Sequence, residues 1–133
     1  MTQSSWYKIT NLGGGVSRIL EQYIAADWRC NIWHVRGRDR DLLVDTGLGL
    51  RPIAKDVAML AERPVIALCT HSHHDHAGGL CQFETRLGHA AEADIFANPT
   101  PQTPVRDSSQ NITDGCYNNE QNYIVPGYQN QSG

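Results

Sequence analysis

The sequence predicts a mixed α/β (α+β) fold, and three observations support this class. Short β-rich runs fill the first part of the chain. Apolar residues at helical spacing follow within residues 49–63, and a continuous apolar run of strand length comes next at residues 65–70. Strands and helices that alternate along a chain are typical of mixed α/β domains.

Two hairpins are expected at the start of the chain. Residues 6–10 and 16–21 are short β-rich runs, and three consecutive glycines between them can adopt positive φ in a turn. Residues 31–36 alternate polar and apolar side chains, and residues 41–45 form a short apolar run after a turn. We expect the last strand of the second hairpin to be buried.

A strand, helix, strand order is expected in the next part of the chain. An apolar residue at every third or fourth position predicts a helix of about ten residues between 49 and 63. The apolar run at 65–70 predicts a strand that is covered on both faces. Further along the chain, we expect a helix near residues 80–87 and a final strand at residues 93–97.

The composition changes after residue 97. Residues 98–133 contain eleven Asn and Gln residues and four of the six prolines, with few hydrophobic residues. A polar segment of this kind is expected to be loop-like or disordered unless other structure covers it. We therefore predict that residues 1–97 form part of a folded domain and that residues 98–133 form a polar tail.

The charge balance excludes some classes of partner. The 133 residues include 11 Lys and Arg against 14 Asp and Glu, which gives a formal charge of -3. Nucleic-acid binding needs clustered cations, and the sequence has no such run. No window approaches the roughly 18 apolar residues of a membrane span, and the first ten residues do not resemble a signal peptide. We expect a cytoplasmic protein with no nucleic-acid or membrane partner.

The four cysteines show no CxxC pair and no regular spacing. This pattern indicates neither a zinc knuckle nor a disulfide framework. Reduced thiols are the simplest interpretation, with Cys30 and Cys69 as small buried residues near strands.

Four of the six histidines lie within residues 71–76, directly after the predicted buried strand. Imidazole and carboxylate groups are good ligands for zinc and similar divalent metals. A turn after a buried strand can direct several of them to one place while the strand holds the backbone. The alternatives are an engineered histidine tract or a surface loop. An acidic residue within the cluster and two glycines after it favour metal binding by His71, His73, Asp75 and His76.

Residues 71–76 match the pattern HxHxDH, and the chain here resembles the metallo-β-lactamase superfamily. Residues 42–47 end in Asp-Thr-Gly, like a strand and turn of this superfamily, and a Gly-Gly-Leu sequence follows at 78–80. Across residues 6–97 the chain is most similar to the glyoxalase-II-like branch. The stretch 29–37 resembles a subgroup that includes acyl-CoA thioesterases.

The resemblance implies the N-terminal half of an αββα sandwich, with a mixed sheet and metals at one edge. It implies that His71 and His73 bind one metal, while Asp75 and His76 bind a second. Asp75 would also orient the water nucleophile. The implied activity is zinc-dependent hydrolysis of a thioester or related acyl bond by a metal-activated water, with iron as an alternative metal. Asp45 would hold the metal loop without touching metal, or it is simply an acidic residue at a strand end.

The other histidines receive structural interpretations. His34 lies in a predicted strand and is expected to be a hydrogen-bonded structural residue. His74 occupies a variable position of the motif and is expected to pack or to line the mouth of the site. His89 is also expected to be structural.

The resemblance does not extend to the distal ligands of the family. No histidine follows His89, and no GHTPG-like turn is present. Each metal therefore has two predicted protein ligands, whereas catalytic zinc normally has three. An alternative interpretation is a truncated metal-binding fragment that is inactive or depends on a partner. Half a sandwich would also expose an apolar sheet face, which favours self-association.

Overall fold

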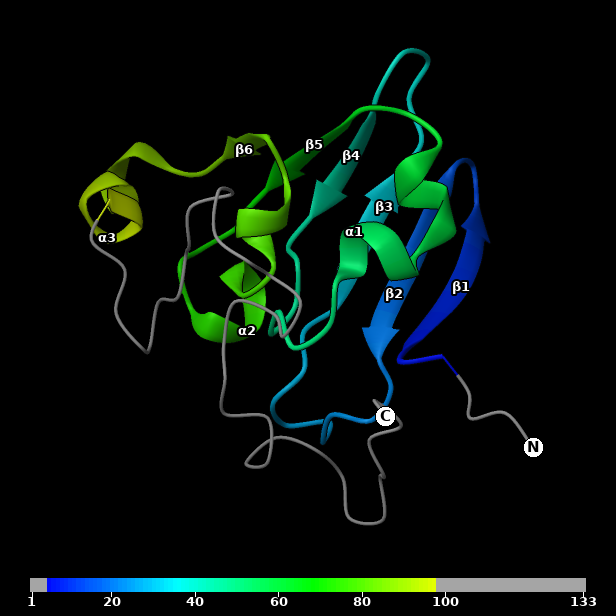
Figure 1. Ribbon diagram of the computed structural model, residues 1–133, viewed down its shortest axis with the longest axis horizontal. Helices are drawn as coiled ribbons and strands as arrows, with labels where there is room; N and C mark the ends of the chain where they lie inside the picture. Colours follow the sequence, from blue (N-terminus) through cyan, green and yellow to red (C-terminus); the bar gives the residue numbers. More distant parts are fainter. Residues whose placement is uncertain (1–4, 98–133) are drawn as a thin grey trace.

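The structure, a computed structural model, describes residues 5–97 and contains a mixed six-stranded sheet (Figure 1). The strand order follows the chain, β1-β2-β3-β4-β5-β6, with antiparallel pairing from β1 to β4 and parallel pairing of β5 with β4 and β6. The predicted mixed α/β class is confirmed. The strands are β1 Tyr7–Gly13, β2 Val16–Glu21, β3 Ile32–Val35, β4 Asp41–Val44, β5 Val65–Leu68 and β6 Thr85–Leu87.

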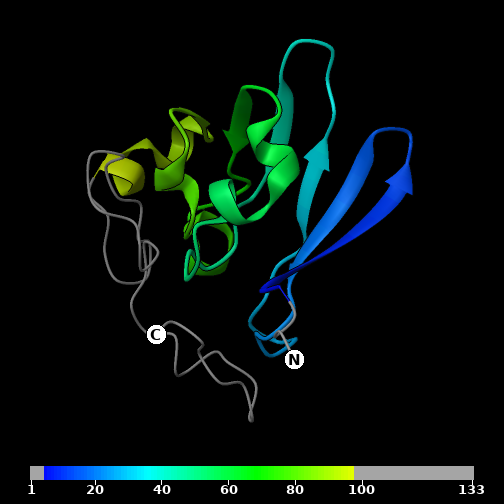
Figure 2. The same cartoon turned by 45° about the vertical axis from the view of Figure 1, so that its right-hand side comes forward.

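The first hairpin pairs β1 with β2 and extends beside the rest of the sheet (Figure 2). Gly13, Gly14 and Gly15 all have positive φ, at 85°, 64° and 82°. L-residues with a Cβ atom rarely adopt this conformation, so the three glycines allow the tight turn. The predicted hairpin is confirmed, and β1 extends three residues beyond the predicted run.

In the central strands β2 to β4, one face of the sheet is buried and the other is half-buried, whereas β1 is mostly exposed and β6 is exposed. On β3 and β4 the burial alternates, so Ile32, His34, Asp41 and Leu43 lie on the buried face. On β5 only Ala67 is fully buried, whereas Ile66 and Leu68, which lie on the opposite face, are half-buried. The prediction that this strand is covered on both faces is therefore wrong for residues 5–97.

The helical segment between β4 and β5 is interrupted. It contains a short helix, α1 Ile53–Asp56, and a 3₁₀ turn, η1 Ala58–Ala61. Val57 between them is extended, with φ -99° and ψ 100°. Ile53, Val57 and Leu60 are buried, so the apolar stripe was placed correctly although the predicted continuous helix is wrong. The β-branched Val57 fits the extended conformation that breaks the helix.

Two further segments differ from the sequence prediction. The helix expected near 80–87 is a 3₁₀ turn, η2 Leu80–Gln82, followed by β6. Pairing with the edge of β5 satisfies the backbone groups of β6, which local sequence cannot reveal. The strand expected at 93–97 is instead a helix, α3 Ala93–Ala97, preceded by η3 Ala90–Glu92. Its alanines are good helix formers.

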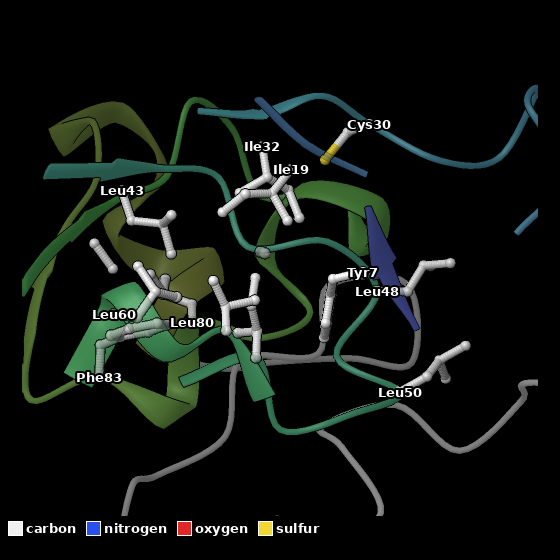
Figure 3. Packing of buried hydrophobic residues seen from close by; sticks show 14 of the residues in the cluster. Tyr7, Ile19, Cys30, Ile32, Leu43, Leu48, Leu50, Leu60, Leu80 and Phe83 are labelled. Carbon is white, nitrogen blue, oxygen red and sulfur yellow. The ribbon is translucent and has the colours of Figure 1, made fainter. Parts of the chain in front are cut away.

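The hydrophobic core lies between the sheet and the segment that contains α1 and η1 (Figures 1 and 3). Ile19, Ile32 and Leu43 from the sheet contribute to the same cluster as Leu60 and Phe83. Burial of these side chains fixes the ends of β4 and β5, and residue 45 and the motif at residues 71–76 follow these ends. No helix among residues 5–97 is long and apolar enough to cross a membrane. The polar tail predicted for residues 98–133 lies outside the described residues.

Candidate metal centre

The histidine cluster begins just after β5 and continues through the short helix α2 His74–Ala77. His73 precedes the helix with an extended backbone, φ -59° and ψ 147°, and its carbonyl accepts hydrogen bonds from the amides of His76 and Ala77. This chain reversal turns the motif back on itself beside the end of β4. Side chains from both sides of the turn can therefore meet.

The structure brings the four predicted ligands together. The ring centres of His71 and His76 are 4.0 Å apart, and those of His71 and His73 are 4.7 Å apart. His76 Nε2 lies 3.4 Å from Asp75 Oδ2. His71, Asp75 and His76 are half-buried, and His73 is exposed. The four side chains therefore lie close together around one turn and are partly accessible to solvent.

Asp45 connects the end of β4 to the motif. Its backbone is in the left-handed region with φ 66°, and its amide donates to the Leu68 carbonyl at the end of β5. Its Oδ2 atom lies 2.7 Å from His76 Nδ1, and its Oδ1 atom accepts the Thr70 amide at 2.8 Å. Asp45 thus holds both the start and the end of the motif.

Thr70 extends this network to a second histidine. Its hydroxyl lies 2.9 Å from both carboxylate oxygens of Asp45 and 3.0 Å from His71 Nδ1. The Nδ1 atoms of His71 and His76 are therefore both engaged by neighbouring side chains, and His76 Nε2 lies 3.4 Å from Asp75 Oδ2. Hydrogen bonds of this kind fix the tautomer and the ring orientation of metal-binding histidines.

The turn after Asp45 is hydrogen-bonded to helix α2 and to the glycines that follow it. The amide and the hydroxyl of Thr46 both donate to the His76 carbonyl, at 2.9 and 3.0 Å. The Thr46 hydroxyl also accepts the Gly79 amide at 3.0 Å, and Gly78 donates to the Gly47 carbonyl at 2.8 Å. These four bonds fix the position of α2 against the Asp-Thr-Gly turn.

The buried carboxyl group of Glu21 supports the same turn through a hydrogen bond. Glu21, at the end of β2, is only 1% exposed, and its Oε2 atom accepts the Leu48 amide at 3.0 Å. Its Oε1 atom lies 3.4 Å from the indole nitrogen of Trp6. Burial raises the pKa of Glu21 to about 7. The sequence gives no signal for this residue because it lies within an ordinary β-rich run.

Glu92 holds the first half of the motif and was also missed in the sequence. Its carboxylate accepts hydrogen bonds from the Ser72 amide at 3.0 Å and from the Ser72 hydroxyl. These bonds lower the pKa of Glu92, and the nearby His71 and His73 lower it further. Ser72 is buried, so Glu92 anchors the backbone between the first two histidines.

Cys30 lies behind the motif. Among residues 5–97, one group of at least three potential donors has all its ligand atoms within 4.8 Å of one another, and it consists of Cys30, Asp45 and His76. Cys30 and Asp45 are buried, and burial raises the pKa of the Cys30 thiol. The sequence did not single out Cys30 for metal binding, because the cysteines form no CxxC pair and show no regular spacing.

The histidines interpreted as structural have identifiable contacts. His34 is 2% exposed, and its Nε2 atom lies 2.8 Å from Asp41 Oδ2. His89 accepts the Ala91 amide at 3.0 Å at the start of η3. The ring of His74 lies 6.4 Å from that of the exposed Trp28.

Two of the described cysteines, Cys30 and Cys69, are free thiols, as predicted. Cys81 is disulfide-bonded, so the prediction of a reduced thiol is wrong for this residue. Cysteine spacing does not reveal which residues meet in a fold.

Comparison with known proteins now identifies the family. The profile of the metallo-beta-lactamase superfamily matches residues 25–103. The chain belongs to this superfamily. It is 40% identical over 111 residues to the human acyl-coenzyme A thioesterase MBLAC2, a match that covers 73% of this chain and 39% of the relative. The chicken (Gallus gallus) protein of the same name is 41% identical over 102 residues, covering 70% of this chain and 37% of the relative.

Solved structures support the same fold. The metallo-beta-lactamase DIM-1 superposes with a TM-score of 0.56 at 13% identity, over 73% of this chain and 49% of that protein. FIM-1 from Pseudomonas aeruginosa, solved in a mono-zinc form, superposes with a TM-score of 0.51 at 22% identity, over 67% and 44% of the two chains. The described residues therefore have the metallo-beta-lactamase fold, and the chain spans about two fifths of the length of its curated relatives.

The donor set fits a zinc-type metal. Three imidazoles and a carboxylate are ligands that zinc accepts, and borderline metals such as iron accept the same groups. The Nδ1 atoms of His71 and His76 are held by Thr70 and Asp45, and His76 Nε2 lies beside Asp75, another predicted ligand. The structure therefore contains side chains of suitable chemistry in suitable orientations, and their role as ligands stays a prediction.

Proposed function

We propose that this chain provides the metal-binding part of a metal-dependent hydrolase that acts on acyl thioesters, with acyl-coenzyme A as the substrate class. The observation that carries the proposal is the Asp45 network, which orients His71 and His76 through their Nδ1 atoms. The identity of 40% to an acyl-coenzyme A thioesterase supports the choice of substrate class.

In this proposal His71 and His73 hold a first zinc ion, and Asp75 and His76 hold a second. When bound, the metal lowers the pKa of a water molecule and stabilises negative charge on the oxygen of the acyl carbonyl. Asp75 is half-buried beside His76, so its second carboxylate oxygen can accept a hydrogen bond from the attacking water. Asp45 keeps its own carboxylate on Thr70 and His76 and acts as a positioning residue.

The reaction is thioester hydrolysis. The oxygen of water bonds to the carbonyl carbon, the bond between carbon and sulfur breaks, and the thiol leaves with a proton. The exposed Trp28 lies 6.4 Å from the ring of His74, a residue of the motif, and an apolar acyl chain can pack against the Trp28 ring. The polar residues of the motif then face the thioester.

The test uses the full chain loaded with zinc and a panel of acyl-coenzyme A and hydroxyacylglutathione thioesters, with released thiol as the readout. We expect cleavage by the wild type and a loss of at least ~100-fold in His71→Ala and His76→Ala, because each change removes a proposed ligand. His89→Ala is the matched control, since this histidine is exposed and contacts its own turn. If the zinc-loaded wild type cleaves none of the thioesters, the proposal that this chain hydrolyses them on its own is refuted.

A second candidate is a metal-binding segment that has no hydrolase activity of its own. It is favoured by the ligand count, because the four motif residues provide two protein ligands for each of two metals, and catalytic zinc normally has three. This candidate predicts metal binding that depends on His71 and His76 without thioester cleavage. Measuring zinc stoichiometry and thiol release on the same preparation separates the two candidates.

A further inference from the structure

We propose that Glu21 is a positioning residue of the candidate metal centre, although it lies at the end of β2 and belongs to no part of the motif. It acts through a single peptide group, the one between Gly47 and Leu48, on the helix α2 that carries Asp75 and His76. The inference rests on the proposed metal-binding role of these two residues. It does not require that the chain hydrolyses thioesters.

The peptide group between Gly47 and Leu48 is held from both sides. Its amide donates to Glu21 Oε2 at 3.0 Å, and its carbonyl accepts the Gly78 amide at 2.8 Å. Among residues 5–97 no peptide bond is cis, so the amide and the carbonyl of this planar group point in opposite directions. Gly78 ends α2. One rigid plane therefore links the buried carboxyl group to the end of this helix, and a shift of the carboxyl group is passed on to the helix.

Glu21 can approach the turn closely because residue 47 is a glycine. A Cβ atom at Gly47 would lie 2.6 Å from Glu21 Oε2 and 3.1 Å from the side chain of Ile32. Gly47 also has φ 75°, which residues with a Cβ atom rarely adopt. On the other side of the carboxyl group, Oε1 lies 3.4 Å from the indole nitrogen of Trp6. With only 1% of Glu21 exposed, packing leaves the carboxyl group little freedom to move between Trp6 and the turn.

The charge of Glu21 is sensitive to a metal ion at the motif. The charged and titratable groups that interact electrostatically with Glu21 are Tyr7, Cys30, Arg51 and Asp75. Burial raises the pKa of Glu21 to about 7, and the negative charge of Asp75 contributes to the increase. A divalent cation bound by Asp75 offsets that negative charge and favours the ionised form of Glu21. Metal binding and loss of the Glu21 proton are therefore coupled.

The ionised carboxylate is also the stronger support for the turn. A hydrogen bond to a charged acceptor is roughly twice as strong as a hydrogen bond between neutral groups. Because the Leu48 amide and the Gly47 carbonyl share one peptide group, polarisation by the carboxylate also strengthens the bond that Gly78 donates. The negative charge therefore acts on the metal centre in two ways, by attraction of the cation and by holding α2 in place.

The test is the zinc affinity of the full chain at pH 6 and pH 8, measured by competition with a chelator. At pH 6 Glu21 of the wild type is mostly protonated, and Glu21→Gln should bind zinc within about twofold of the wild type. At pH 8 Glu21 is mostly ionised, and the affinity of Glu21→Gln should be about tenfold weaker. A purely structural role would give the same ratio at both pH values. Glu84→Gln is the matched control, because Glu84 is exposed, and it should follow the wild type.

The number of protons released on zinc binding gives a second readout. Isothermal titration at pH 6.5 in two buffers of different ionisation enthalpy measures this number. Glu21→Gln should release fewer protons than the wild type, by up to about one. The proposal is overturned if the two proteins release the same number of protons, or if their zinc affinities differ by the same factor at pH 6 and pH 8.

Trp6→Phe covers the case in which Glu21→Gln does not fold. This change keeps Glu21 and removes the indole N–H, whose hydrogen bond lowers the pKa of Glu21. The rise of zinc affinity with pH should therefore move to higher pH, and an unchanged pH profile contradicts the proposal.

The outcomes separate this proposal from the hydrolase proposal. Zinc binding that depends on Glu21 without thioester cleavage supports the positioning role and refutes autonomous hydrolysis. Thioester cleavage with zinc binding that does not depend on Glu21 refutes the positioning role alone. If the wild type binds no zinc, both proposals are refuted.

Discussion

Asp45 Oδ2 lies 2.7 Å from His76 Nδ1, although the two residues are 31 positions apart in the chain. This bond joins the end of β4 to helix α2, and Thr70 connects the same carboxylate to His71. A single carboxylate therefore orients two of the proposed metal ligands. The sequence left two interpretations of Asp45 open, and the orienting role stays a prediction that these hydrogen bonds make testable.

The first prediction concerns the charge of Asp45. Asn has nearly the same shape and tolerates the left-handed backbone of residue 45, so Asp45→Asn mainly removes the negative charge. We expect zinc affinity to fall by about 10- to 100-fold, the usual effect of losing a carboxylate partner of a ligand histidine. Isothermal titration with zinc measures the change.

The control for this prediction is Asp39→Asn. Asp39 is exposed in the turn between β3 and β4, and its carboxylate pairs with the adjacent Arg38. The zinc affinity of the Asp39→Asn variant should equal that of the wild type. Equal affinities for wild type and Asp45→Asn would contradict the orienting role.

The strands and the position of the motif could be predicted because they depend on local pattern. The second strand matches its predicted range, residues 16–21, and the glycine turn before it has the expected positive φ. The wrong predictions of secondary structure fall on short segments whose residues fit both a helix and a strand. Residues 85–87 form a strand because the edge of β5 is available for pairing, and Val57 interrupts a helix in an extended conformation that suits its β-branched side chain.

The residues of the candidate site also fall into two groups, those that the sequence could predict and those that it could not. His71, His73, Asp75 and His76 are close in sequence, so their proximity in space was predictable. Cys30, Glu21 and Glu92 contact the same region from other elements. Such long-range contacts leave no spacing in the sequence, because they form only when separate segments meet in the fold.

The second prediction concerns Glu92, which anchors Ser72 between His71 and His73. Removing its carboxylate in Glu92→Ala frees the Ser72 amide and hydroxyl, so the histidine turn loses a support. We expect zinc affinity to fall by about tenfold. Competition with a colorimetric chelator measures it. Glu84→Ala is the matched control, because Glu84 is exposed, and an equal effect of both changes would argue against an anchoring role for Glu92.

The third prediction separates backbone conformation from packing. Gly49 has φ 74°, and a Cβ atom there would overlap the backbone of Gly78. Gly14 has φ 64°, and a Cβ atom there would meet nothing within 4 Å. Gly14→Ala should therefore cost about 1–2 kcal/mol from conformation alone, and Gly49→Ala should cost clearly more. Urea unfolding gives both values, and similar losses would show that the turn and α2 are not in tight contact.

The last prediction is the pH dependence of stability that Glu21 causes. Its pKa is about 7 in the folded chain because of burial, and its ordinary value is 4.5. Between these values the folded chain binds more protons than the unfolded chain, so stability falls as the pH rises through this window. The titration of Glu21 should lower the free energy of unfolding by about 3 kcal/mol, and this decrease should be complete above pH 7.

Glu21→Gln removes this titration while it keeps a side chain of similar shape. The free energy of urea unfolding, measured without metal at pH 5 and at pH 8, should therefore differ less in Glu21→Gln than in the wild type. The exposed variant Glu84→Gln should keep the wild-type pH dependence. If wild type and Glu21→Gln lose the same stability between pH 5 and pH 8, the carboxyl group of Glu21 does not titrate in this window, which contradicts the prediction.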